Sequence, residues 1–147
     1  MVRKKPTYPA VARPKPALAR RRPEGVRVGR SSAGLGLFAT GPYKKGERII
    51  EYFGRTLSKD EEYSSRSKYL FEVNSRKTID GTTRENIARY INHSCTPNCE
   101  PEIERGRIFI DAIKKIKPGE ELVYDYGEEY FNEHIKPYGC RCAKKKH

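Results

Sequence analysis

The sequence predicts a mostly β domain made of several short strands, with one or two short helices. Apolar runs of strand length recur from residue 26 onward, and turn-forming sequences separate several of them. The runs are GLGLFAT, ERIIEYFG, YLFEVN, RIFIDAI and EELVYDYG, and the turns are GPYKKG, NSRK and KPG. A length of 147 residues suits one such domain.

Residues 1–24 form a basic tail rich in proline and alanine, which we predict to be disordered. The tail has five prolines, no hydrophobic periodicity and eight basic side chains against Glu24 alone, so it cannot bury enough surface to offset its ordering entropy. Residues 140–147 add four basic side chains, which leaves the middle of the chain nearly neutral. The N-terminal tail is either a solvating segment or an arm that contacts nucleic acid phosphates, and its lysines are also candidate substrates.

No segment of the chain has the pattern of a membrane span or a secretory signal. No apolar run approaches the roughly 20 residues that span a bilayer, and the N-terminus lacks the apolar stretch of a signal peptide. We therefore expect a protein without a membrane partner that works inside a cell, in the cytoplasm or on chromatin in the nucleus. Cysteines in those compartments stay thiols or bind metal.

The best helical candidate is TRENIARYINH, which ends in the chain's most unusual motif. Thr82 and Glu85 stand at the spacing of a capping box, and Ile87, Tyr90 and Ile91 recur at helical spacing. One or two helical turns are therefore expected to lead into the following cysteines.

The stretch RYINHSCTPNCE, residues 89–100, contains one of the three histidines and two of the four cysteines. A nucleophile and its base usually come from separate parts of a chain, which disfavours a His93–Cys95 dyad. Cys140, Cys142 and His147 near the C-terminus offer zinc ligands, and one cysteine of the Cys95/Cys99 pair completes four. The alternative is that the thiols pack in the core and that His147 is a frayed end.

Two further motifs are ambiguous when each is taken alone. The glycines of RSSAGLGLFAT lack the third glycine and the helix of a dinucleotide site, so this G-x-G favours a turn. Tyr124 and Tyr126 of EELVYDYG project from the same face of a strand, as paired tyrosines of a packed core do.

Taken together and in order, these motifs resemble the SET-domain family of protein lysine methyltransferases. The motifs are SSAGLGLFA, EYFG, YLFEVN, ARYINHSCTPNC, ELVYDYG and a C-x-C pair. The resemblance assigns residues 25–130 to a SET domain and residues 131–147 to a short post-SET segment. It implies several small, curved β-sheets and a C-terminal pseudoknot, in which the ELVYDYG segment threads beneath the NHSC loop.

The resemblance also implies an S-adenosylmethionine site and a lysine channel. Asn92 and His93 are expected to hold the cofactor, with Tyr69 and the backbone of Ala33, Gly34 and Leu35. Tyr126 matches the catalytic tyrosine, which orients the lysine amine and the methyl group. Tyr52 matches a tyrosine of the channel wall, and Tyr124 matches the position where tyrosine favours mono- or dimethylation.

Zinc is implied on Cys95, Cys140 and Cys142, with His147 as fourth ligand. The family motif C-x-C-x4-C reads C-x-C-x4-H here, and Cys99 is expected to be a packed thiol outside the zinc site. The predicted activity is methyl transfer from S-adenosylmethionine to a protein lysine, with a histone or histone-like tail as the first substrate. The alternatives are a non-catalytic chromatin or nucleic-acid-binding module that uses a SET scaffold with basic tails, and methylation of a small molecule.

Overall fold

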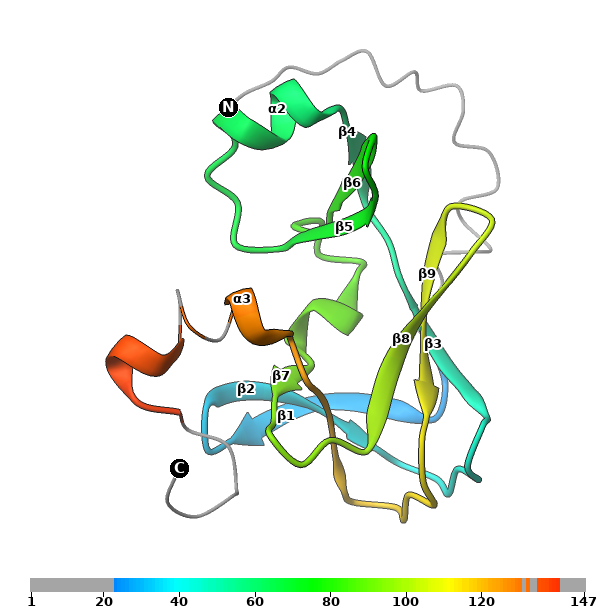
Figure 1. The fold of residues 1–147 in the computed structure, drawn as a ribbon. Helices are drawn as coiled ribbons and strands as arrows, with labels where there is room; N and C mark the ends of the chain where they lie inside the picture. The colour runs from blue at the N-terminus through cyan, green and yellow to red at the C-terminus, as the bar shows by residue number, and fades with distance from the viewer. Residues whose placement is uncertain (1–22, 131, 133–134, 141–147) are drawn as a thin grey trace.

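The computed structural model describes residues 23–130, 132 and 135–140, and they form three small sheets (Figure 1). The four-stranded sheet has the order β1 (Val26–Ser31), β2 (Gly34–Ala39), β10 (Glu121–Tyr124) and β7 (Asn92–His93). One three-stranded sheet has the order β3 (Arg48–Tyr52), β9 (Arg107–Ala112) and β8 (Cys99–Glu104). The other has the order β4 (Arg55–Leu57), β6 (Lys77–Asp80) and β5 (Leu70–Asn74). The expected architecture of several small sheets is confirmed.

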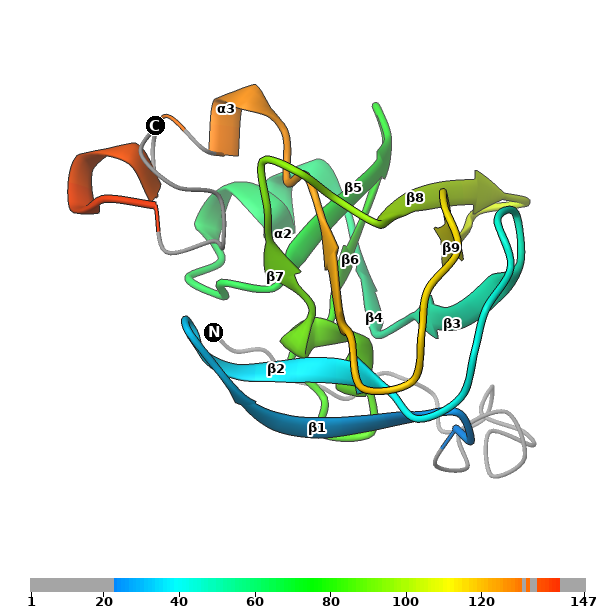
Figure 2. The ribbon, with the colours of Figure 1, turned by 90° about the horizontal axis from the view of Figure 1, so that it is seen from below.

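The four-stranded sheet joins the two ends of the domain. β1 and β2 form an antiparallel hairpin in which Ser31 pairs with Gly34, and Gly34 has a φ of +107° that favours glycine. β10 pairs antiparallel with β2 and parallel with β7, so a late strand lies between two earlier ones (Figure 2). The loop after β7 also holds β10, because the Ser94 N–H donates to the Tyr124 carbonyl at 3.0 Å. The expected association of the ELVYDYG segment with the NHSC loop is therefore confirmed.

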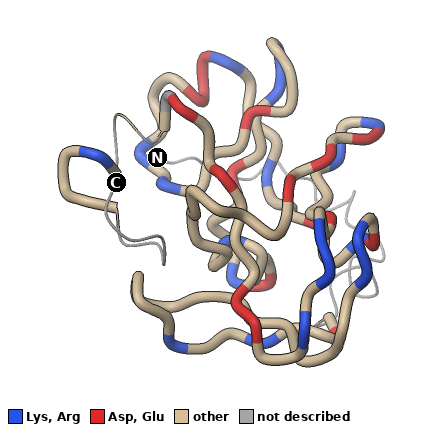
Figure 3. The backbone as a smooth tube through the Cα atoms, turned by 60° about the horizontal axis from the view of Figure 1, so that its bottom comes forward, with Lys and Arg blue, Asp and Glu red and all other residues tan. Residues whose placement is uncertain are grey.

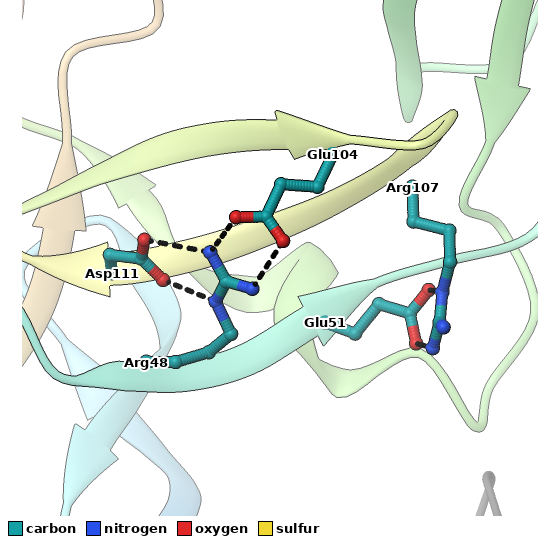
Figure 4. Close-up of polar contacts among 5 residues, drawn as sticks. All are labelled: Arg48, Glu51, Glu104, Arg107 and Asp111. Atoms are coloured by element: carbon teal, nitrogen blue, oxygen red, sulfur yellow. Dashed lines mark hydrogen bonds and ion pairs between the residues drawn. The ribbon is translucent and has the colours of Figure 1, made fainter.

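The β3-β9-β8 sheet carries exposed ion pairs that tie its strands together (Figure 4). Arg48 on β3 reaches Asp111 on β9 at 2.8 Å and Glu104 on β8 at 3.1 Å. Arg107 on β9 reaches back to Glu51 on β3 at 2.9 Å. These bonds fix the register of the sheet more than they add stability, because exposed pairs contribute little.

The β4-β6-β5 sheet carries a short helix that sequence analysis missed. α2 (Lys59–Ser64) begins after Ser58, whose side chain accepts from the Glu61 N–H, while the Glu61 side chain accepts from the Ser58 N–H. This reciprocal pair is a capping box, and it satisfies two donors at the start of the helix. The remaining short helices are η2 (Ile87–Tyr90), α3 (Glu128–Tyr130) and η4 (Lys136–Tyr138).

The capping box expected at Thr82 and Glu85 is wrong. The Thr82 hydroxyl donates to Asp80 instead, and the Glu85 carboxylate accepts from Thr83. The segment forms only the 3-10 turn η2, although Ile87 and Ile91 are buried as their spacing predicted. The Thr82 hydroxyl is therefore engaged in a local turn with Asp80 and does not cap a longer helix.

The core lies where the sheets meet η2. Its fully buried side chains include Leu37, Ile91, Ile108, Ile110 and Leu122. Acidic and basic residues are distributed along the described part of the chain (Figure 3). The tail over residues 1–22 and much of the expected post-SET segment lie outside the described residues. Among the described residues, no helix has the length and apolar character needed to cross a membrane.

Candidate active site

An aromatic pocket of about 330 Å³ lies between the ends of β3, β5 and β10 and the helix α3. Six rings line it, and they come from distant parts of the chain: Tyr52, Tyr69, Phe71, Tyr124, Tyr126 and Tyr130. Four of them are residues that the sequence predicted for catalysis or cofactor binding. The pocket therefore gathers Tyr52, Tyr69, Tyr124 and Tyr126 into one place.

Five of the rings, all except that of Tyr69, are linked by the following series of contacts. Tyr52 lies 5.2 Å from Phe71, and Phe71 lies 6.3 Å from Tyr124, measured between ring centroids. Tyr126 lies 5.1 Å from Tyr124 and 5.0 Å from Tyr130, the latter in a T-shaped arrangement. Such tilted contacts are favourable for aromatic pairs and hold each ring in place.

Glycines allow Tyr52 to occupy its position at the end of β3. A Cβ on Gly81 would lie 2.6 Å from the Tyr52 ring, and a Cβ on Gly54 would lie 2.0 Å from the Asp80 carbonyl oxygen. The Tyr52 hydroxyl donates to the Tyr69 carbonyl at 2.7 Å. This bond joins the expected channel wall to the expected cofactor-binding segment.

The hydroxyls of the three tyrosines predicted for catalysis stay protonated. Burial is the main cause that raises the pKa of Tyr52, of Tyr124 and of Tyr126 above the ordinary value, and neighbouring tyrosines raise each pKa further. The charged form of each is disfavoured because the hydroxyl groups themselves are buried. Each of these hydroxyls is therefore a neutral hydrogen-bonding group in this structure.

Tyr126 makes two hydrogen bonds to the chain around the NHSC motif, one to Ile91 and one to His93. Its hydroxyl donates to the Ile91 carbonyl, and its backbone N–H donates to Nδ1 of His93 at 3.1 Å. Because Nδ1 is the acceptor, the ring proton of a neutral His93 lies on Nε2. Nε2 lies 3.3 Å from Sγ of Cys95, so it is the donor in that contact.

The predicted cofactor-binding residues outside the pocket meet in the four-stranded sheet. The side-chain nitrogen of Asn92 donates to the Leu35 carbonyl at 2.9 Å, and it also contacts Ser31 and Glu121. Ser31 accepts from the Ala33 N–H at 3.1 Å. The structure thus brings Asn92 to the turn that contains Ala33, Gly34 and Leu35.

Two of the predicted zinc ligands also lie together. Sγ of Cys95, Sγ of Cys140 and a ring nitrogen of His93 lie within 4.8 Å of one another. Two thiols fit zinc chemically, whereas Nε2 of His93 carries the proton and is better suited to donate to a thiolate than to bind the metal. Cys142 and His147 lie outside the described residues.

Cys99 is separate from this cluster. Its side chain is buried on β8, and burial raises the pKa of its thiol to about 12. The thiol donates to the Asn98 side chain at 3.3 Å. Cys99 is thus a packed thiol.

Sequence analysis missed Arg89, which lines the pocket beside Tyr69. Its guanidinium carbon lies 5.0 Å from the Tyr69 ring centroid and 4.9 Å from that of Tyr90. Its Nε is buried and has no hydrogen-bond partner among the described residues. The sequence signal that could have identified Arg89 is its position next to Tyr90 and three residues before Asn92.

The chain belongs to the SET-domain family. The family model described as "SET domain" matches residues 34–127, which span β2 to β10 and include the pocket residues Tyr52, Tyr69, Tyr124 and Tyr126. This match confirms the resemblance on which the predicted fold and site residues rested.

Curated relatives match most of this chain but are much longer proteins. "Histone-lysine N-methyltransferase trr" of Drosophila melanogaster is 40% identical over 120 residues, covering 73% of this chain and 5% of the relative. "Histone-lysine N-methyltransferase 2D" of Homo sapiens is 37% identical over 123 residues, covering 75% and 2%. "Histone-lysine N-methyltransferase, H3 lysine-4 specific" of Emericella nidulans is 39% identical over 138 residues, covering 84% and 11%. The chain therefore spans only a small part of these relatives.

Solved structures share the fold. Chaetomium thermophilum Polycomb Repressive Complex 2 bound to GSK126 matches with a TM-score of 0.63 and 38% identity, covering 69% of this chain and 16% of that one. A ctPRC2 structure described as autoinhibited and bound to S-adenosylmethionine matches with a TM-score of 0.62 and 37% identity, covering 70% and 15%.

Proposed function

We propose that this chain transfers a methyl group from S-adenosylmethionine to the ε-amine of a lysine in a protein substrate. The observation that carries the proposal is the aromatic pocket. The three buried tyrosines expected for catalysis line it and belong to one continuous series of ring contacts. The aliphatic part of a lysine suits such a lining. The names of the curated relatives, all histone-lysine methyltransferases, support the same reaction.

The hydrogen bonds of the pocket indicate how the amine is held. Because the Tyr126 hydroxyl donates its proton to the Ile91 carbonyl, its oxygen retains lone pairs that can accept from an amine N–H. The Tyr52 hydroxyl is arranged in the same way by its bond to the Tyr69 carbonyl. Accepting from the N–H groups points the nitrogen lone pair toward the methyl donor, and such alignment is the main catalytic need.

When bound, S-adenosylmethionine supplies the methyl group on a positively charged sulfur. The lysine nitrogen must arrive uncharged, and its burial among the pocket rings favours its neutral form. The nitrogen forms the new bond to the methyl carbon as the carbon–sulfur bond breaks, and the proton of the methylated nitrogen leaves to solvent. The protonated tyrosines need not accept this proton. Because only the neutral lysine amine reacts, the rate should rise with pH as the lysine deprotonates.

We also propose mono- or dimethylation, with histone-like tails as substrates. No described residue bonds to the Tyr124 hydroxyl, although only 7% of the Tyr124 residue surface is exposed. That hydroxyl therefore occupies space in the pocket and can bond to the amine or to a water, which leaves less room for a third methyl group. The substrate class rests on the relatives' names.

A zinc-held post-SET segment is proposed to close the pocket. Cys95 and Cys140 would hold the metal, with Cys142 and His147 as the remaining ligands. The proximity of Cys95 and Cys140 supports this arrangement. Tyr130, the residue directly before this segment, packs on Tyr126.

The test is transfer of label from S-adenosylmethionine to core histones, compared with a whole-cell extract. Tyr126→Phe should lower the rate about 100-fold or more, the usual effect of removing one well-placed hydroxyl. Tyr63→Phe is the matched control, because Tyr63 on α2 is 93% exposed. No transfer to either protein mixture, or equal transfer by Tyr126→Phe, would refute the proposal.

The same variants separate the enzyme from a binding module. Deletion of residues 1–24 should leave methyl transfer intact and remove any binding to nucleic acid that weakens with salt. Tyr126→Phe should have the opposite effects. Nucleic acid binding without methyl transfer would favour the module.

A further inference from the structure

Glu121 holds the side-chain amide of Asn92 in a single orientation. Nδ2 of Asn92 lies 2.9 Å from Oε2 of Glu121, 2.9 Å from the Leu35 carbonyl oxygen and 3.1 Å from Oγ of Ser31. These acceptors come from β10, β2 and β1, while Asn92 lies on β7. A flipped amide would place Oδ1 against a carboxylate and a carbonyl, which repel it. Nδ2 of Asn92 therefore points toward these acceptors in the sheet.

The opposite end of the amide is left for a ligand. Among the described residues, none donates to Oδ1 of Asn92, and the residue is only half-buried. A hydrogen bond from Nδ2 to a carboxylate polarises the amide and makes Oδ1 a stronger acceptor. An oxygen polarised in this way favours a cationic N–H donor, such as an ammonium group.

Gly36 provides the space for the carboxylate of Glu121. A Cβ on Gly36 would lie 2.5 Å from Oε2 of Glu121 and 3.1 Å from its Cδ. Gly36 is buried in β2, and its conformation is not left-handed, so the close approach is the reason for glycine here. The second glycine of the G-x-G motif therefore makes room for the Glu121 side chain, whereas Gly34 allows the positive φ of the turn.

We propose that Glu121 is a positioning residue that presents Oδ1 of Asn92 to the ammonium group of the methyl donor's amino acid portion. Because Gly36 has no side chain, it leaves the space through which the Glu121 carboxylate reaches Asn92. The inference rests on the proposed function, because it assumes that the methyl donor binds beside Asn92. In this proposal Glu121 neither contacts the methyl donor nor takes part in methyl transfer, and it acts only through Asn92.

The test compares two ligands that differ in the amino acid portion. S-adenosylhomocysteine contains that portion, and 5′-methylthioadenosine lacks it. By calorimetry, Glu121→Ala should weaken S-adenosylhomocysteine about tenfold or more, the effect expected when a bond to a charged group is lost. Its affinity for 5′-methylthioadenosine should stay within about twofold of the unmodified chain.

Two variants probe the cause. Glu121→Gln keeps an acceptor oxygen near Nδ2 and should recover most of the affinity for S-adenosylhomocysteine. Gly36→Ala keeps Glu121 but fills the gap, so it should reproduce the selective loss. Glu102→Ala, on an exposed position of β8, controls for the loss of one negative charge and should bind both ligands normally.

The outcomes distinguish the two proposals. If Glu121→Ala weakens both ligands equally, or neither, the positioning role is wrong even though the methyl donor binds. If the unmodified chain binds neither ligand, the proposed function fails and the positioning role fails with it. Thermal melting of each variant identifies any loss of affinity that comes from unfolding.

Discussion

The backbone N–H of Tyr126 donates to Nδ1 of His93, whose Nε2 lies 3.3 Å from Sγ of Cys95. One imidazole thus contacts both the segment expected to be catalytic and a cysteine expected to bind zinc. Its ring also packs edge-on against the Tyr126 ring at 5.5 Å. The two contacts use different ring nitrogens of His93, so substitutions can remove them one at a time.

Two substitutions should separate the contacts of His93. Asparagine can place an oxygen where Nδ1 lies, and glutamine can place an amide group where Nε2 lies. We expect His93→Asn to keep the Tyr126 bond and most of the methyl transfer but to release zinc faster. His93→Gln should keep zinc and lose about tenfold in rate, the effect of one lost hydrogen bond. Kinetics and a colorimetric zinc chelator measure both, and identical effects of the two variants would contradict this division.

The two cysteines of the NHSCTPNC segment should differ in metal binding. Cys95→Ala should abolish stoichiometric zinc, because Cys95 lies within 4.8 Å of the Cys140 thiol. Cys99→Ala should retain zinc and lower the free energy of unfolding by about 1 kcal/mol, since it removes only a buried thiol. Metal analysis by mass spectrometry and chemical denaturation measure these effects. Zinc retained by Cys95→Ala would remove Cys95 from the site.

Removal of the Tyr124 hydroxyl should change the product. Tyr124→Phe creates space in the pocket and leaves the neighbouring rings in place, so the variant should accumulate trimethyl-lysine. The unmodified chain should stop at one or two methyl groups. Mass spectrometry of the modified peptide over time distinguishes these products, and trimethyl-lysine as the main product of the unmodified chain at low enzyme concentration would contradict the assignment.

Gly54→Ala should be far more destabilising than Gly41→Ala. A Cβ on Gly54 would meet the Asp80 backbone at 2.0 Å, whereas nothing lies within 4 Å of a Cβ on Gly41. We expect Gly54→Ala to lower the free energy of unfolding by about 1–3 kcal/mol, the usual cost of overpacking, and Gly41→Ala to stay within about 0.5 kcal/mol. Chemical denaturation compares them, and equal stabilities would show that the chain near Asp80 moves freely.

Sequence patterns predicted the elements whose signals are local. GLGLFAT, ERIIEYFG and RIFIDAI contain β2, β3 and β9, and KPG is the turn before β10. The two-residue strand β7 could not be predicted in this way, because only its pairing with β10 makes it a strand. Helix α2 was missed although Ser58 and Glu61 carry the capping-box pattern, which was assigned to Thr82 and Glu85 instead.

The candidate site shows the same division. Family motifs identified Tyr52, Tyr69, Tyr124 and Tyr126, which the pocket brings together. They did not reveal the bond from Asn92 to Glu121, because 29 residues separate the two in the chain. The tautomer of His93 likewise depends on a backbone N–H that only the folded chain supplies.

The position of β10 between β2 and β7 has a consequence for the order of folding. Until residues 121–124 are made, β2 and β7 have no strand to join them. Contacts between segments so far apart form slowly, because a long loop must close first. During synthesis the nascent chain can complete the β3-β9-β8 and β4-β6-β5 sheets first, and with them the contact of Tyr52 with Phe71. Asn92 has no bond to Glu121, and Phe71 no contact with Tyr124, until β10 has been inserted. The Asn92 contacts and the aromatic pocket would then be completed together, when β10 pairs with β2 and β7.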